Sequence, residues 1–370
     1  FAGAGIELRH PWTESMQITA TGGVQEFGRK WARNDYPLQA LFEMGVSLAK
    51  VPELDWREAE SRTRMALLAE QGVRFVVSRL GVPRDPGALP DATGVSAFEL
   101  NLTIEGFERD RAAVRALRER SGRAVYLCRI RGGADDTRFD GKHFSHFVKA
   151  GFTVDELPAY RDQIAQAVAQ GTIDGITIRA EPDADLVTAA EVLGRFCDDT
   201  GARLLVSVKL AGNNVAGERT DDGQTVSLAA RALLLSRLDD RIQWLFDTFM
   251  DVDRGYFPRH AFIDRRFNPR AAAQAWSMIA ARFSGATVSR ATRSSLALAG
   301  HDLVVMVDGK ALVLLTGTGQ ELAERAAGIG RPVDWSADIV QAPNDTLTGR
   351  WPQLPAGANG VQAWLAVLTG

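Results

Sequence analysis

A repeated alternation of strand-like and helix-like segments runs through the middle of the chain. The helix-like segments carry apolar residues at the spacing of one helix face, and the strand-like segments are short apolar runs. Such alternation predicts βαβ units and a parallel sheet. The strand-like runs lie at 73–79, 97–102, 124–131, 175–181, 203–210 and 242–248, and the helix-like runs at 56–71, 105–120, 154–170, 185–199, 227–238 and 270–283.

These six strands, with one or two weaker candidates near the start such as residues 39–44, fit an eight-stranded barrel. The long loops follow strands, as the active-site face of a (β/α)8 barrel requires. The alternative is an open, doubly wound sheet, but no glycine-rich phosphate-binding turn follows a strand. We therefore predict an α/β fold with a (β/α)8 TIM-like barrel over residues 36–283.

The pattern changes at residue 284, where helices give way to short β runs separated by Gly and Asp-Gly. Asp308-Gly309 is typical of a tight hairpin turn. Residues 284–370 are predicted to form a small all-β, sandwich-like accessory domain. Residues 1–35 read as short strands and loops, and we expect this N-terminal β segment to pair with that domain.

Composition narrows the function classes. The 370 residues carry a net charge of −3, which gives no global field for nucleic acid or an anionic membrane. No apolar stretch reaches the length of a membrane span. The two cysteines, Cys128 and Cys197, are too few for a disulfide framework, so we expect reduced core residues.

The chain begins with Phe1, which is consistent with a processed chain or a piece of a longer one. The location stays open, with a cytoplasmic one slightly favoured.

Each predicted strand becomes polar toward its C-terminal end along one of its two faces. In a barrel those ends meet at the mouth, where catalytic residues sit. The end residues that we take as inward facing are Arg79, Glu99, Asn101, Arg129, Arg131, Arg179, Glu181, Lys209 and Asp247.

Glu181 and Asp247 are the predicted catalytic pair, with Glu99 as a third candidate. Acid/base chemistry uses two carboxyl groups whose surroundings separate their pKa values. Arg179 beside Glu181 favours the ionised form, whereas aromatic neighbours of Asp247 favour its protonated form. In the alternative interpretation, these carboxylates are ion-pair partners that hold the mouth together.

The cations at the strand ends predict an anion-binding mouth. Arg79, Arg129 or Arg131, Arg179 and Lys209 would converge there with Asn101, and guanidinium groups suit a carboxylate, sulfate or phosphate. Buried charges need partners in any case. The same cations are therefore equally compatible with pairing to Glu99, Glu181 and Asp247.

Loop 251–260 is dense in polar and aromatic residues, as a substrate-facing loop would be. We predict that Asp251, Tyr256 and His260 contact substrate and that Trp244 stacks on a sugar, although loop packing explains the same residues. His143 and His146 are three positions apart but have no evident third ligand. We predict no metal and no cofactor.

The run AFIDRRFNPR at 261–270, with the strand before it and the helix after it, resembles the last strand, loop and helix of retaining glycoside hydrolases with (β/α)8 barrels. Many of those enzymes also carry a small β domain after the barrel. The resemblance implies hydrolysis by two glutamates, but the fourth strand here carries Glu99-Leu100-Asn101 rather than Asn-Glu. Lys209 stands where the nucleophile would end the seventh strand.

The sequence as a whole predicts a glycoside hydrolase-like enzyme that acts on an anionic carbohydrate or sugar acid through carboxylate acid/base chemistry. A sugar-acid lyase, isomerase or lactonase is the alternative among enzymes. A non-catalytic barrel that binds a glycan is the alternative from another class. The expected partner is a small molecule or oligosaccharide, with no nucleic acid and no membrane, and the oligomeric state stays open.

Overall fold

A computed structural model gives the fold of the chain. It describes residues 3–9, 12, 15–18, 30–33, 35–83, 93–131, 150–210, 222–251, 261–264, 266–291, 301–354 and 360–368. The predicted site residues Tyr256 and His260, and the pair His143 and His146, lie outside these ranges.

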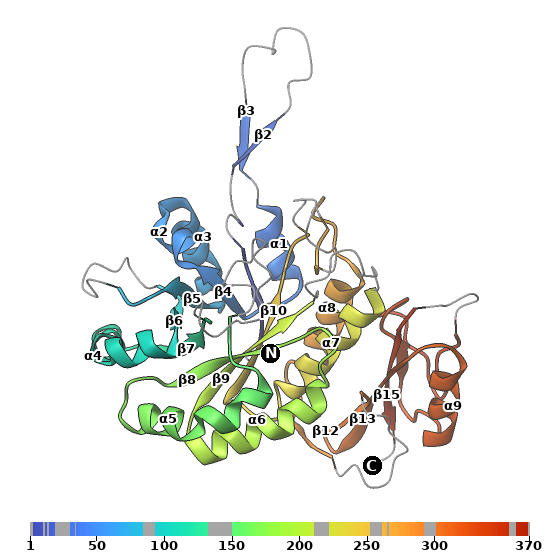
Figure 1. The fold of residues 1–370 in the computed structure, drawn as a ribbon. Helices are drawn as coiled ribbons and strands as arrows, with labels where there is room; N and C mark the ends of the chain where they lie inside the picture. Colours follow the sequence, from blue (N-terminus) through green and yellow to red (C-terminus); the bar gives the residue numbers. More distant parts are fainter. Residues whose placement is uncertain are drawn as a thin grey trace, which may run out of the picture.

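Eight parallel strands close into a barrel (Figure 1), which confirms the predicted fold class. Each strand is hydrogen-bonded to a neighbour on both sides, and the ring closes where β1 pairs with β10 and β4. In chain order the strands are β1 (Ala4–Glu7), β4 (Leu48–Pro52), β5 (Arg74–Leu80), β6 (Val95–Leu102), β7 (Ala124–Arg129), β8 (Gly175–Ala180), β9 (Arg203–Lys209) and β10 (Ile242–Asp247).

Helices connect the strands and cover the outside of the barrel. Two of them have clear signals at both ends: Thr103 and Asp185 cap the starts of α4 and α6 through their side chains, and Gly122 and Gly201 end them in the left-handed conformation. The helices are α1 (Tyr36–Glu43), α2 (Glu53–Arg57), α3 (Ala59–Glu70), α4 (Ile104–Ser121), α5 (Leu157–Ala169, preceded by the 3-10 turn η3, Val154–Glu156), α6 (Leu186–Thr200), α7 (Asp222–Leu235) and α8 (Ala271–Phe283).

The start of the barrel corrects two expectations. Residues 39–44, considered as a strand, fall in and just after α1, which has Pro37 in its first turn and buries Ala40 and Leu41 one turn further along. The first two barrel strands are instead β1 and β4, which are four and five residues long. The barrel therefore begins at Ala4, and none of the described residues before Tyr36 lies in a strand of the accessory sheet. The short antiparallel pair β2 (Ser15–Ile18) and β3 (Lys30–Arg33) follows β1.

The accessory region is one antiparallel sheet of five strands in the order β11-β12-β13-β15-β14. The accessory region is therefore largely β, as predicted. Asp308 and Gly309, both with positive φ, form the predicted hairpin turn between β12 and β13. The strands are β11 (Val288–Arg290), β12 (Leu303–Val307), β13 (Lys310–Gly317), β14 (Ser336–Asp338) and β15 (Gln362–Leu368), and helix α9 (Gly319–Ile329) accompanies them.

The two faces of this sheet explain why it is not a sandwich in the described part of the chain. Along β12, Leu303 and Val305 join the barrel core, whereas Val304 faces a separate cluster with Leu322 of α9. Barrel helices and α9 therefore cover both faces of the sheet. Buried Arg231 of α7 fixes the junction, because its guanidinium donates to Thr316 Oγ1 at 2.8 Å and to His301 O at 2.8 Å.

Candidate functional site at the barrel mouth

The inside of the barrel changes from apolar to polar at the same step along every strand. Six buried apolar side chains pack together near the strand starts, and two glycines occupy the corresponding positions of β1 and β8. We call them the apolar set: Gly5, Leu48, Val76, Ala97, Tyr126, Gly175, Leu205 and Leu245. The next inward residue of each strand, two positions further on, forms the polar set: Glu7, Lys50, Ser78, Glu99, Cys128, Thr177, Ser207 and Asp247.

Glu99 of β6 is the most enclosed carboxylate of the polar set. Its Oε2 accepts from Lys50 Nζ at 3.1 Å and from Thr177 Oγ1 at 2.8 Å, and its Oε1 accepts from Ser78 Oγ at 2.7 Å. Asn101, the next inward residue, donates to Ser78 Oγ at 2.9 Å. Glu99 is 1% exposed, and both of its oxygens are engaged, so it is poorly placed to exchange protons with a substrate.

Asp247 lies at the end of β10 between two cations. Lys209 Nζ donates to its Oδ2 at 2.9 Å, and the Arg9 guanidinium donates to Oδ1 at 2.8 and 3.0 Å. Glu7 connects this group to Glu99, because it lies 2.9 Å from Lys50 Nζ and 3.8 Å from Lys209 Nζ. Positive and negative charges therefore alternate from Arg9 to Glu99.

The network keeps its carboxylates ionised and its lysines protonated. Burial opposes ionisation of Asp247, but the charges of Lys209 and then Arg9 outweigh it, so the pKa lies well below its usual value. Burial likewise opposes ionisation of Glu99, and Lys50 with two hydroxyl donors lowers its pKa on balance. Burial alone would lower the pKa values of Lys50 and Lys209, yet neighbouring carboxylates raise both. The prediction of a protonated Asp247 is therefore wrong: it considered the aromatic neighbours and missed Arg9.

The stability of the fold is expected to be greatest on a plateau between about pH 5 and pH 10. The lowered pKa values of Glu99 and Asp247 contribute fully above their ordinary values of 4.5 and 3.8, and the contribution is lost as the pH falls through the folded values. The raised pKa values of Lys50 and Lys209 contribute fully below 10.5 and are lost as the pH rises through the folded values. Urea unfolding at a series of pH values measures this profile. A free energy of unfolding that changes steeply across neutral pH would contradict it.

Arg179 follows Thr177 on the inward face of β8, and Glu181 comes directly after the end of that strand. The Glu181 side chain is 43% exposed, and its Oε1 lies 2.9 Å from Arg179 Nε. Strand β9 separates them from Asp247, because β8 and β10 both pair with it. Glu181 and Asp247 therefore belong to the same mouth but to strands that are not adjacent, with Lys209 between them.

Three predicted anion-binding arginines are paired with carboxylates of the covering segments. Arg79 Nη1 donates to Glu53 of α2 at 2.8 Å, and Arg129 and Arg131 donate to Glu156 of η3 at 2.8 and 2.7 Å. The inward residues of β5 and β7 are Ser78 and Cys128 instead. Our choice of inward face was thus wrong for these two strands, since Phe75, Val77 and Leu127 pack in the core outside the barrel.

Two further residues that we predicted to contact substrate, Trp244 and Asp251, have structural roles instead. Trp244 is 1% exposed on the outward face of β10, which rules out stacking on a sugar in the mouth. Asp251 accepts from Arg270 Nη1 at 2.6 Å and from the Ala261 backbone at 3.2 Å, so it anchors the segment after β10. Asn101, by contrast, lies in the mouth beside Ser78 as predicted.

Four residues of the network were absent from our predictions: Glu7, Arg9, Lys50 and Ser78. Glu7 and Lys50 lie on the short strands that the periodicity did not identify, and Arg9 follows the first of them. A sequence signal for Glu7 and Lys50 was nevertheless present. In both short strands a charged residue follows a non-polar one two positions later, from Gly5 to Glu7 and from Leu48 to Lys50, as at the ends of β9 and β10.

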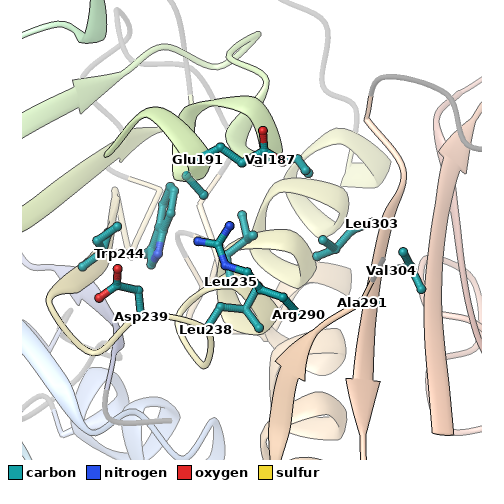
Figure 2. A pocket seen from close by; sticks show the side chains of 12 residues that line it. Val187, Glu191, Leu235, Leu238, Asp239, Trp244, Arg290, Ala291, Leu303 and Val304 are labelled. Atoms are coloured by element: carbon teal, nitrogen blue, oxygen red, sulfur yellow. The ribbon is translucent and has the colours of Figure 1, made fainter. Parts of the chain in front are cut away.

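A cleft lies on the outer side of the barrel, between α6, the end of α7, the start of β10 and the accessory strands (Figure 2). Its lining includes Trp244, Glu191, Asp239 and Arg290 among apolar side chains. No member of the polar set lines it. Because barrel enzymes place their chemistry at the C-terminal strand ends, we take the mouth as the candidate site.

Comparison with known proteins finds similarity among solved structures. No protein-family model matches the sequence, and no curated protein sequence matches it. Among solved structures, it is similar to a calcium-binding mutant of Bacteroides uniformis beta-glucuronidase 2, with a TM-score of 0.45, 11% identity and coverage of 86% of this chain and 44% of that one. The chain therefore spans less than half the length of that protein.

Two shorter enzymes are matched over most of their length. They are a GH10 endoxylanase from a sugarcane soil metagenome (TM-score 0.41, 12% identity, 74% of this chain and 96% of that one) and a GH128 exo-beta-1,3-glucanase from Aureobasidium namibiae (0.39, 9%, 66% and 92%). The closed ring of eight parallel strands shows by itself that the fold is a (β/α)8 barrel. At these identities the likeness extends to the fold alone.

The described residues contain neither a cluster of metal ligands nor a membrane-spanning helix. Nowhere in those ranges do three or more His, Cys, Asp or Glu side chains come together in a way that would hold a metal ion. No described helix is long and apolar enough to cross a membrane.

Proposed function

We propose that the chain is a glycoside hydrolase-like enzyme that acts on an anionic carbohydrate or a sugar acid at the barrel mouth. The observation that carries the proposal is the state of Asp247, a carboxylate held ionised by Lys209 and Arg9 at the C-terminal end of a barrel strand. Its side chain keeps 12% of its surface exposed, so a ligand in the mouth can contact it.

The two mouth carboxylates suit different parts of glycoside hydrolysis. The transition state carries positive charge on the sugar ring, and an ionised carboxylate stabilises it or attacks it. Asp247 fits this role and cannot supply a proton. Glu181 is far more exposed and can exchange a proton with solvent, which assigns to it the transfer to and from the leaving oxygen.

The same residues also suit a lyase, isomerase or lactonase that acts on a sugar acid. A non-catalytic glycan-binding barrel is the second candidate, and a specific observation favours it. Glu7, Glu99, Asp247 and Glu181 each already have a cationic partner within 3.1 Å. A mouth in which every described carboxylate is paired in this way resembles a structural ring as much as a catalytic centre.

A panel of chromogenic glycosides in matched pairs, each a uronide and its neutral hexoside, separates these candidates. The proposal expects turnover of at least one uronide above that of its neutral partner, and loss of that turnover in Asp247→Asn. Saturable binding of uronides without release of the chromophore would favour the glycan-binding barrel. Neither turnover nor binding would contradict both.

A further inference from the structure

Among the described cations of the mouth, Arg179 has the least compensation. It is 9% exposed, and its guanidinium Nη1 is buried without a hydrogen-bond partner among the described residues. Nε lies 2.9 Å from Glu181 Oε1, but the angle does not make a hydrogen bond, and the Glu181 side chain is partly exposed. A buried charge with one exposed partner is costly to the fold, because little replaces the water that it loses.

Ser207 lies beside Arg179 on the neighbouring strand and has the same deficit. The two residues are register partners of β8 and β9, so their Cα atoms are about 4.8 Å apart and their side chains share the inward face. Ser207 is 2% exposed, and its Oγ has no hydrogen-bond partner among the described residues. Two neighbouring residues on adjacent strands of the mouth thus each carry an unsatisfied donor.

The backbone that carries Arg179 is fixed. Its amide donates to Phe152 O at 2.7 Å, and the Phe152 amide donates to Thr177 O at 2.9 Å, so the chain before α5 is pinned along the end of β8. Gly151 makes this approach possible: its φ is +103°, and a side chain there would meet the Arg179 backbone nitrogen at 3.1 Å. The backbone at Arg179 is therefore held in place before any ligand arrives.

We propose that Arg179 and Ser207 form a subsite for a carboxylate, and that this carboxylate is the acid group of the sugar on which the mouth acts. A guanidinium offers parallel N–H donors that match the two oxygens of a carboxylate, and a hydroxyl can complete the set. The subsite rests on the function proposed above and specifies its substrate as one whose acid group points toward β8 and β9.

The other cations of the mouth do not compete for this role. Lys50 lies within 3.1 Å of both Glu7 and Glu99, and Lys209 and Arg9 share Asp247. With Arg179 and Glu181 these residues make four cations and four carboxylates. The charges of these eight groups balance, and Arg179 alone among the four cations has buried donor capacity to spare for an arriving anion.

The first test needs no ligand. In Arg179→Met an apolar side chain of similar length replaces an uncompensated charge, so the melting temperature is expected to stay level or rise. Arg231→Met is the matched control, since that buried arginine donates to Thr316 and His301 and its loss should lower the melting temperature by several degrees. An equal fall in the two variants would show that Arg179 serves the fold and would overturn the subsite.

The second test measures anion binding with sodium acetate, acetamide and D-glucuronate at constant ionic strength. Acetate, unlike acetamide, should raise the melting temperature of the wild-type protein saturably. Arg179→Met should weaken that binding by about tenfold or more, and Ser207→Ala should weaken it several-fold. An identical response to acetate in the wild type and Arg179→Met would overturn the subsite.

Glucuronate separates this inference from the proposed function. Tighter binding of glucuronate than of acetate, dependent on Arg179, supports both. Arg179-dependent binding of acetate with no gain for glucuronate keeps a carboxylate subsite but contradicts a sugar acid as its ligand. Loss of activity in Asp247→Asn bears on the proposed function alone.

Discussion

Replacing Asp247 by asparagine is expected to lower turnover of an anionic glycoside by about 10²-fold or more, the usual scale of lost carboxylate catalysis. The amide keeps the shape of the side chain but carries no charge. It can neither stabilise a cationic sugar ring nor attack it. Steady-state kinetics of the wild type and the variant measure the effect, and a thermal melt confirms that the barrel is folded.

Asp247→Asn also removes an ion pair, so its control must do the same away from the mouth. Asp174 precedes β8 at the opposite end of the barrel and pairs with Arg118 at 2.8 Å. Asp174→Asn should cost stability and leave turnover near the wild-type value, because that end of a barrel supports the fold. Equal losses of turnover in the two variants, or a fully active Asp247→Asn, would remove Asp247 from the mechanism.

Glu181→Gln completes the functional prediction. If Glu181 transfers the proton, this variant should also lose about 10²-fold or more in turnover, while substrates with an already acidic leaving group should be affected least. A loss that is the same for good and poor leaving groups would indicate a role in binding. Wild-type turnover would show that Glu181 only pairs with Arg179.

Replacing Lys50 by methionine is expected to lower the free energy of unfolding by about 3–5 kcal/mol, the scale for breaking a buried ion pair by removing one partner. Lys50 is the cation that Glu7 and Glu99 share, and Glu99 is almost fully buried. Without it, two carboxylates remain inside the barrel with less compensation. Urea unfolding monitored by tryptophan fluorescence and circular dichroism measures the change.

The control for Lys50→Met is a lysine in an exposed pair. Lys310 lies 2.9 Å from Asp334, and both side chains are more than half exposed. Lys310→Met should change the free energy of unfolding by less than about 1 kcal/mol, because water screens such pairs. If Lys50→Met costs no more than Lys310→Met, the network does not hold the mouth together.

The barrel could be predicted because six of its strands are separated by helices with a clear apolar face. Strands β1 and β4 could not, since four or five residues give too short a pattern and a lysine lies in the middle of β4. Helix α1 was mistaken for a strand because its apolar residues are few and close together.

The inward face was harder to predict than the strands themselves. Parallel barrel strands are buried on both sides, so apolar residues occupy both faces and the alternation is weak. In β5 the correct face is marked by one residue, Ser78, while Arg79 on the other face is the more conspicuous. In β8 to β10 the charged residues at the strand ends follow one parity and an unbroken apolar series follows the other, and there the choice of inward face was right for Arg179, Lys209 and Asp247.

The pairing of charges depends on contacts that local sequence patterns do not contain. Arg9 and Asp247 are 238 positions apart, and Thr177 reaches Glu99 from 78 positions away. Barrel closure brings β1 against β10 and so places Arg9 where it changes the protonation of Asp247. The sequence alone could therefore identify Glu99 and Asp247 as mouth residues, but it could not predict their ion-pair partners or the protonation state of Asp247.

The most direct measurement is a crystal structure of the protein soaked with a uronic-acid oligosaccharide. We predict a sugar in the barrel mouth, with its carboxylate at hydrogen-bond distance, about 2.7–3.2 Å, from the Arg179 guanidinium. Asp247 would then face the anomeric carbon of the same sugar or of its neighbour. A sugar bound in the outer cleft beside Trp244 and Arg290, with the mouth empty, would show that the mouth is not the functional site.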